Sequence, residues 1–332
     1  MANRFLIAEV GSVHDGSFGN ACKLIDLAAS CGADVVKFQT HIAAEETLCN
    51  APSPAYFNGE TRFDYFQRTS FSIAQWQSLM DYALNLGIQL ISSPFSIAAI
   101  SILEYIGVGM YKVPSGEVTN IPLLEKLCDI GKPVILSSGM SCWQELDTAV
   151  EIFKGNVDLT VMQCTSAYPC PPHRVGLNII NDIQARYGDW VGVGFSDHTS
   201  GIAAGPAAAA VGANVIEKHL TFSRHMYGSD ASNALEPQDF TQYSTLVRET
   251  WQIVSNPVDK NDLSSLSEMK VVFEKSIVAA RPLSQNSILT LADLAFKKPG
   301  DGISAFEYQS LIGRQICRDL PANHKFSEDD FK

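Results

Sequence analysis

Residues 191–219 read VGVGFSDHTSGIAAGPAAAAVGANVIEKH, and this stretch decides the fold. It holds two short apolar runs, 191–196 and 214–219. His198 follows the first run closely, and His219 stands at the end of the second. A helical pattern of small residues, 201–211, connects the two runs. Strands joined by a helix favour a parallel pairing. Both histidines are therefore expected at the same edge of one sheet, where a cation or an anionic substrate would be held.

The same alternation of strand and helix patterns runs through most of the chain. Strands are predicted over 5–10, 34–39, 89–93, 110–113, 133–137, 159–163, 191–196 and 214–219. Helices are predicted over 19–31, 72–86, 96–106, 121–130, 142–153, 177–187, 201–211 and 237–254. Eight such units over about 250 residues are typical of an α/β fold of the (β/α)₈, or TIM-barrel, type. A doubly wound open sheet is the alternative, but no GxGxxG motif follows the first strand.

Two stretches depart from this pattern. Residues 40–70 form an unusually long connection after the second strand, which we interpret as a lid or as a surface insertion. A polar segment then follows the last helix and precedes short strand-like pieces. We therefore divide the chain into a barrel domain (1–254), a linker (255–274) and a small β-rich domain (275–332).

Composition narrows the possible partners and the compartment. The 332 residues carry a formal net charge of −12, which argues against nucleic acid or an anionic membrane as a partner. We expect no signal peptide, because the first apolar run is broken at Glu9. We also expect no membrane span, because no stretch approaches about 20 apolar residues. Eight scattered cysteines without a CxxC pair read as reduced thiols, so a cytoplasmic protein is expected.

The carboxyl ends of the predicted strands carry polar residues throughout. In TIM barrels this rim holds the active site. Lysines and serines that converge there would bind phosphate or carboxylate, two imidazoles would bind a divalent cation, and carboxylates would move protons. Each residue alone has an ordinary structural interpretation, but the joint pattern favours a catalytic rim. Because strands alternate sides, Lys218 and His219 cannot both face the centre.

Eight motifs, in order, resemble the sialic acid synthase family, the phosphoenolpyruvate-dependent nonulosonate synthases. They are IAEVGSVHDGS, GADVVKFQT, SSPFS, KVPSGEVTNIPLLE, GKPVILSSGMS, QCTSAYP, GFSDHT and GANVIEKHLT. The tail resembles the SAF (antifreeze-like, β-clip) domain that follows the barrel in this family. The resemblance implies a transferase that joins phosphoenolpyruvate to an open-chain N-acetylmannosamine-like sugar with C–O cleavage and release of phosphate.

The resemblance also implies roles for individual residues. The catalytic set would be Glu9, Glu117, His198 and His219, of which the two histidines would bind Mn²⁺ or Mg²⁺. Phosphoenolpyruvate would be bound by Lys37, Ser93, Lys112, Ser115, Ser137, Ser166 and Ser196. The N-acetylated amino sugar would be bound by Asn58, Glu117, Tyr168, Asp230 and, from the partner subunit of a homodimer, Lys298.

This chain departs from the family pattern at several positions. Ser166 stands where relatives commonly have asparagine, and SVHDG replaces NNHNG, which leaves the roles of His14 and Asp15 open. Lys298 replaces an arginine, and lysine cannot form the same bidentate contacts. A legionaminic or pseudaminic acid precursor is therefore an alternative substrate. More distant alternatives are a Schiff-base aldolase using Lys112 or Lys218 and a non-catalytic sugar-binding protein.

Overall fold

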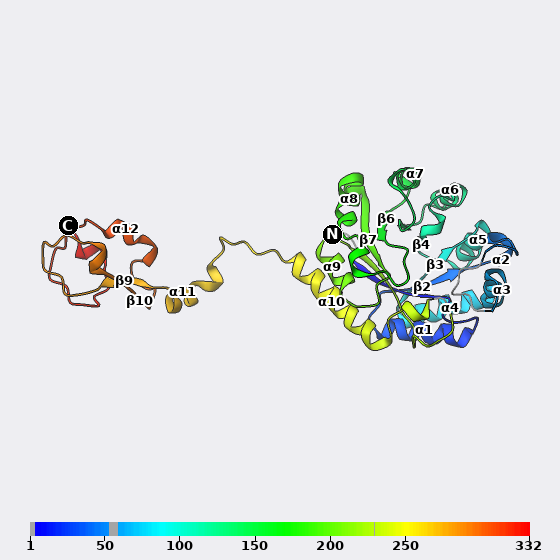
Figure 1. Ribbon diagram of the computed structural model, residues 1–332, viewed down its shortest axis with the longest axis horizontal. Helices are drawn as coiled ribbons and strands as arrows, with labels where there is room; N and C mark the ends of the chain where they lie inside the picture. The colour runs from blue at the N-terminus through cyan, green and yellow to red at the C-terminus, as the bar shows by residue number, and fades with distance from the viewer. Residues whose placement is uncertain (1–3, 53–58, 229) are drawn as a thin grey trace. The chain divides into compact units, whose positions relative to one another are not determined.

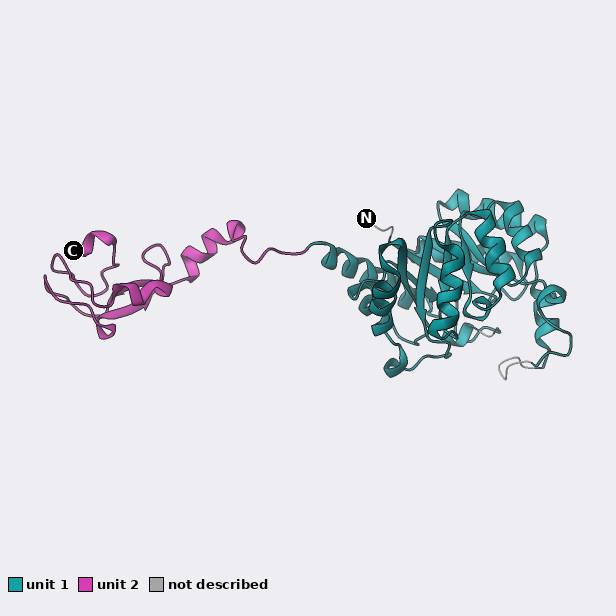
Figure 2. Cartoon of the chain, turned by 90° about the horizontal axis from the view of Figure 1, so that it is seen from above, with its two compact units in different colours: residues 1–256 teal, residues 257–332 magenta. Residues whose placement is uncertain are grey.

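The computed structural model describes residues 4–52, 59–228 and 230–332, and the chain forms two compact units (Figure 1). Unit 1 spans Met1–Asn256 and unit 2 spans Pro257–Lys332, as Figure 2 shows in teal and magenta. None of the helices in the described ranges is long and apolar enough to cross a membrane.

Unit 1 is a closed barrel of parallel strands in the order β1 to β8, so the predicted TIM barrel is confirmed. Pairing of β8 with β1 closes the barrel and excludes the open sheet. The strands are β1 (Phe5–Gly11), β2 (Val35–Thr40), β3 (Gln89–Pro94), β4 (Tyr111–Val113), β5 (Val134–Ser137), β6 (Leu159–Cys164), β7 (Val191–Asp197) and β8 (Val215–His219).

Helices surround the barrel, and their ends follow from local sequence. Ser72 begins α4 with a capping box to Gln75, and Gly87 ends it in a left-handed conformation, φ +73°. The helices of unit 1 are α1 (Phe18–Ser30), α2 (Ala43–Glu46), α3 (Arg62–Thr69), α4 (Ile73–Leu86), α5 (Ile97–Ile106), α6 (Ile121–Ile130), α7 (Trp143–Phe153), α8 (Asn178–Tyr187), α9 (Ala204–Ala210) and α10 (Pro237–Ser255).

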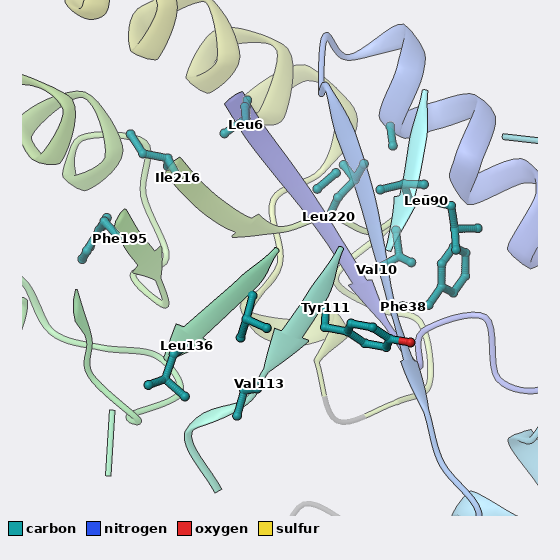
Figure 3. Packing of buried hydrophobic residues seen from close by; sticks show 14 of the residues in the cluster. Leu6, Val10, Phe38, Leu90, Tyr111, Val113, Leu136, Phe195, Ile216 and Leu220 are labelled. Carbon is teal, nitrogen blue, oxygen red and sulfur yellow. The ribbon is translucent and has the colours of Figure 1, made fainter. Parts of the chain in front are cut away.

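Side chains alternate between the two faces of each strand, and this sorts the core into two parts. Outward residues such as Phe38, Leu136 and Phe195 pack between the strands and the helices (Figure 3). Inward residues at the amino-terminal side fill the barrel with an apolar layer made of Ile7, Val35, Ile91, Met110, Ile135, Met162 and Val215. The next inward positions along each strand lie above this layer and are mostly polar.

The connection over residues 40–70 is more ordered than the expected loop. It contains α2 and α3, and residues 53–58 within it are not described. Thr61 caps α3 by accepting a hydrogen bond from the Asp64 amide. Tyr65 and Phe66 on α3 are buried and pack with Ala43, so apolar contact holds this helix against α2.

Unit 2 has its own core and a two-stranded antiparallel sheet. The strands β9 (Ser276–Ala279) and β10 (Leu294–Lys297) pair, and Leu311, Ile316 and Phe326 are among the buried residues. Two helices, α11 (Ser267–Phe273) and α12 (Tyr308–Leu311), complete the unit. α11 falls inside the segment 255–274, and the rest of unit 2 consists of short 3₁₀ helices, turns and isolated bridges.

Candidate active site

A cavity of about 730 Å³ opens at the carboxyl ends of the barrel strands. It brings together residues from every strand or from the loop that follows it. Among the lining residues are these predicted ones: Glu9, Lys37, Ser93, Lys112, Ser115, Ser137, Ser166, Tyr168, Ser196, His198, His219 and Asp230. Most of the residues predicted from the sequence therefore share one space.

Three predicted residues are not among the lining residues that the structure describes. Glu117, in the short 3₁₀ helix η1 (Ser115–Glu117), is half-buried beside the lining residue Gly116 and accepts a hydrogen bond from Asn120. Lys298 belongs to unit 2, where its Nζ lies 4.9 Å from the centre of the Phe273 ring. Asn58 lies outside the described residues.

Two buried lysines form the cationic side of the cavity. Lys112 donates a 2.7 Å hydrogen bond to Ser137 Oγ, and Lys37 donates one of 3.4 Å to Ser93 Oγ. Burial lowers the pKa of Lys112, whereas the carboxylates around Lys37 outweigh burial and raise its pKa. Ammonium groups with hydroxyls beside them are suited to binding phosphate.

Glu217, which the sequence analysis did not single out, lies between these two lysines. Its Oε2 is 3.5 Å from Lys112 Nζ and 3.6 Å from Lys37 Nζ, and Ser196 donates a hydrogen bond to Oε1. Burial alone would raise the pKa of Glu217, but the two ammonium charges lower it to about 2. Alternation along β8 could have indicated this residue, because it shares a face with His219.

A chain of hydrogen bonds leads from the cavity to α2. Gln39 Nε2 donates to Glu9 Oε1 at 2.7 Å, and Gln39 Oε1 lies 3.1 Å from His41 Nε2. His41 Nδ1 lies 2.7 Å from Glu46, and its ring stacks on Phe66 and Phe95. Burial raises the pKa of Glu9 to about 7, although Lys37 opposes this shift. A carboxyl group with such a pKa can exchange a proton at neutral pH.

His198 and His219 lie side by side in the cavity, with ring centroids 5.7 Å apart. His198 Nδ1 is 3.0 Å from the carbonyl oxygen of Thr165, so it carries the proton and leaves the lone pair on Nε2. Tyr168 Oη lies 3.2 Å from this Nε2. Burial lowers the pKa of His219 to about 4, and its buried Nδ1 has no hydrogen-bond partner among the described residues.

This donor set fits a divalent cation bound by two imidazoles. In the described ranges, no group of three histidine, cysteine or acidic side chains is arranged to hold a metal ion. A cation between His198 and His219 would therefore need oxygen atoms of water or substrate to complete its coordination, which is compatible with a Lewis-acid role.

Three other residues near the rim, Lys218, His14 and Asp15, are not among the residues that line the cavity. Lys218 points outward and pairs with Asp197, and neither side chain is exposed. The suggestion of Lys218 as a Schiff-base lysine is therefore wrong, since strand alternation places it behind the barrel wall. His14 packs against Phe38 and Phe71, and Asp15 pairs with Arg68.

Comparison with known proteins places this barrel in a family. Residues 24–259 match the NeuB family, and residues 274–332 match the SAF domain. The chain belongs to the NeuB family. A relative from Campylobacter jejuni, an N,N'-diacetyllegionaminic acid synthase, is 33% identical over 95% of this chain and 96% of its own length.

Two further comparisons, one with a human protein and one with a crystal structure, agree with this family. The human N-acetylneuraminate-9-phosphate synthase is 33% identical over 94% of this chain and 88% of its own. A crystal structure of the N-acetylneuraminic acid synthetase of Leptospira borgpetersenii, in complex with citrate, is 29% identical with a TM-score of 0.71. That likeness covers 80% of this chain and 90% of the other. The resemblance to this family in the sequence is thus confirmed.

Proposed function

We propose that the chain is a nonulosonate synthase that condenses phosphoenolpyruvate with an open-chain N-acetylmannosamine-like sugar. The observation that carries this proposal is the division of one cavity into two sides. Lysines and serines form one side, paired histidines form the other, and the chain belongs to a family whose relatives are named as such synthases.

The reaction balances without an oxidant or reductant. C3 of phosphoenolpyruvate forms a bond to the aldehyde carbon, and the aldehyde oxygen takes up a proton. Water adds at C2, the bond between C2 and the phosphate oxygen breaks, and inorganic phosphate leaves. The product is a 2-keto acid that is longer than the sugar by the three carbons of phosphoenolpyruvate.

The cationic side of the cavity would hold phosphoenolpyruvate. Lys37 and Lys112 would contact its phosphate and carboxylate, and Ser93 and Ser137 are already hydrogen-bonded to these lysines. Glu217 neutralises part of their charge, so the site remains buried without two uncompensated cations. Ser115, Ser166 and Ser196 supply further hydroxyls around the same space.

The other side of the cavity would hold the sugar aldehyde. Mn²⁺ or Mg²⁺ bound by His198 and His219 would supply Lewis-acid polarisation of a carbonyl oxygen. Tyr168 and Asp230 lie among the lining residues and would contact the sugar hydroxyls. Glu9, with its pKa raised to about 7 by burial, would exchange a proton with the water or the new hydroxyl.

The test is release of phosphate from phosphoenolpyruvate across a panel of sugars. The panel contains N-acetylmannosamine, its 6-phosphate and 2,4-diacetamido hexoses. We expect release only when an accepted sugar is present, and ¹⁸O in the bridging oxygen should appear in the phosphate. No release with any sugar, or label in the ketone instead, would overturn the proposal.

A cation requirement is tested separately. Chelation should abolish phosphate release, and Mn²⁺ or Mg²⁺ should restore it. Full activity in a chelated, metal-free sample would contradict the requirement for a cation but not the proposed condensation reaction. Trapping of a Lys112 adduct with borohydride, with no effect of chelators, would instead favour the aldolase alternative.

A diacetamido sugar is a second candidate substrate, leading to a legionaminic acid-type product. Two observations favour it: a relative with that product, and Lys298 in place of the family arginine. Turnover of the diacetamido sugar at least tenfold faster than of N-acetylmannosamine would decide for it, and the reverse ratio would decide against it.

A homodimer is the remaining part of the proposal and rests on the family resemblance. In such a dimer Lys298 of one chain would serve the cavity of its partner. Chains ending at residue 256 would then regain activity when mixed with full-length chains carrying His198→Ala. A protein that sediments as a monomer at the concentration of the assay and is fully active there would exclude this arrangement.

A further inference from the structure

Behind the two histidines lies a buried ion pair on the outer face of the barrel. Asp197 on β7 and Lys218 on β8 are direct neighbours across the two strands, with Oδ1 and Nζ 3.1 Å apart. Neither side chain is exposed to solvent. Each residue immediately precedes one of the histidines in the chain.

Two further groups complete this pair. The Thr199 amide donates a 2.8 Å hydrogen bond to Asp197 Oδ1, and Lys218 Nζ donates to the Thr199 carbonyl oxygen. Tyr243 on α10 donates a 3.1 Å hydrogen bond to Asp197 Oδ2. Tyr243 reaches this point only because α9 has Gly205, where a Cβ atom would lie 2.1 Å from Tyr243 Oη.

Stability alone does not explain charged residues at these positions. The preceding outward residues of the same strands, Phe195 and Ile216, are apolar and pack against the helices (Figure 3). A buried ion pair must recover the cost of removing both charges from water, and apolar residues of similar volume are often as stable. What an ion pair adds is a fixed geometry, since each charge requires its partner.

We propose that Asp197, Lys218 and Tyr243 are positioning residues that fix the orientation of His198 and His219 in the cavity. The inference rests on the proposed function, because it assumes that the imidazoles act together on one cation and one aldehyde. The ion pair joins the ends of β7 and β8, where each strand leads into the loop that follows it. Alternation then directs both imidazoles inward.

The cost of losing this arrangement follows from the geometry. Without the pair, the two strand ends keep the backbone hydrogen bonds that finish at Asp197 and Lys218 and, inside the barrel, the hydrogen bond from Ser196 to Glu217, but they lose the contacts on the outer face. Small movements of a catalytic group reduce rates by large factors, on the order of a hundredfold for about 1 Å. Loss of the outer contacts should therefore weaken cation binding before it unfolds the barrel.

The experiment uses the full chain and two variants that avoid an unpaired buried charge. Tyr243→Phe removes one hydrogen bond, and the double variant Asp197→Asn with Lys218→Met removes both charges together. Mn²⁺ binding is measured by titration calorimetry, without substrate. We expect roughly tenfold weaker binding in each variant, in the range seen for residues that orient metal ligands. The affinity for phosphoenolpyruvate should change less.

Trp251→Phe is the matched control. It removes a 2.8 Å hydrogen bond from the same helix, α10, to Ala213, which precedes the start of β8 and is remote from its end. This variant should lose stability without loss of Mn²⁺ affinity. If all three variants bind Mn²⁺ as the wild type does, the positioning role is wrong.

A second measurement separates this inference from the proposed function. Nitrogen NMR shifts of labelled histidine report the tautomer of His198, which the structure assigns to Nδ1–H through Thr165. If the wild type binds no Mn²⁺, the cation part of the proposed function fails. The positioning role of Asp197, Lys218 and Tyr243 is then tested by the tautomer of His198 alone. A single tautomer in the wild type and a mixture in the variants would support it; unchanged spectra would overturn it.

Discussion

Glu217 determines how the two cavity lysines keep their charge. Burial lowers the pKa of Lys112, and the Glu217 carboxylate counteracts this effect. Glu217→Gln should lower the pKa of Lys112 further, so that phosphoenolpyruvate binding is lost at a lower pH. At a pH above the new pKa, each unit by which the pKa of Lys112 falls reduces its charged fraction about tenfold. At pH 6.5 the loss should be small, because the variant also removes a repulsion of phosphate.

The affinity for phosphoenolpyruvate between pH 6.5 and 9 is the measurement that checks this. Ser137→Ala is the control, since it removes a hydrogen bond from Lys112 without changing a charge. Parallel pH profiles for wild type and Glu217→Gln would show that Glu217 does not hold the lysine in its charged state.

His14 makes the stability of unit 1 dependent on pH. Burial lowers its pKa from 6.5 to about 4, with a smaller effect from His41. Above pH 6.5 the folded and unfolded states are both neutral, and the stabilisation is fully present. As pH falls from 6.5 to 4, only the unfolded state takes up the proton, so the free energy of unfolding decreases by on the order of 3 kcal/mol.

His14→Asn should remove this part of the pH dependence. An asparagine can still accept the hydrogen bond that the Gly16 amide donates to His14 Nδ1. Between pH 7.5 and pH 5.0, the free energy of unfolding measured with urea should fall by about 2 kcal/mol less in the variant than in the wild type, because His219 keeps its own lowered pKa in both proteins. An equal loss in both proteins would assign the pH dependence to other groups.

Sequence predicted the residue types of the cavity better than their pairings. Lys37, Lys112 and His219 were identified because they lie at or near the carboxyl ends of predicted strands. Glu217 was missed because its importance comes from lysines on β2 and β4, which only barrel closure brings to it. Strand alternation already indicated that Lys218 and His219 cannot both face the centre, and the structure places Lys218, the second lysine of the Schiff-base alternative, on the outer face with Asp197.

At the scale of an element, the end of β1 depends on a glycine. Gly11 has φ +51°, and a Cβ atom there would lie 2.5 Å from Asp230 Oδ2 and 3.3 Å from Gln39 Nε2. Gly11→Ala should therefore displace both side chains from the sugar side of the cavity. We expect a rise in the KM for the sugar and a fall in kcat/KM of up to about a hundredfold.

Steady-state kinetics with each substrate in turn check this expectation. Gly87→Ala serves as the control, because Gly87 also has a positive φ, +73°, but no atom lies within 4 Å of its Cβ position. That variant should lose about 1 kcal/mol of stability and keep its KM values. Equal kinetics for the two variants would mean that Gly11 matters only for folding.

Strands and long helices were predicted within a few residues because glycine caps and apolar runs mark their ends. The short helices α2 and α3 were not predicted. Four and eight residues are too few for a clear helical period, and α3 is held by contacts of Tyr65 and Phe66 with Ala43 that local sequence does not reveal.

At the scale of the whole molecule, the two units have separate cores. The chain between them, from 257 to 263, is exposed and has no helix or strand. Limited proteolysis should cut in this stretch and leave two fragments that each unfold cooperatively. Mass spectrometry identifies the cut, and circular dichroism during heating checks the fragments. An unfolded fragment 257–332 would show that its core needs the rest of the chain.

The apolar layer inside the barrel gives the cavity a closed floor. The inward positions directly above it hold Glu9, Lys37, Ser93, Lys112, Ser137 and Glu217. One step nearer the opening, His219 ends β8 and His198 follows the end of β7. Such a blind-ended space favours an ordered reaction. In the proposed function, phosphoenolpyruvate would enter before the sugar that lies above it, and phosphate formed near the floor would leave after the new acid.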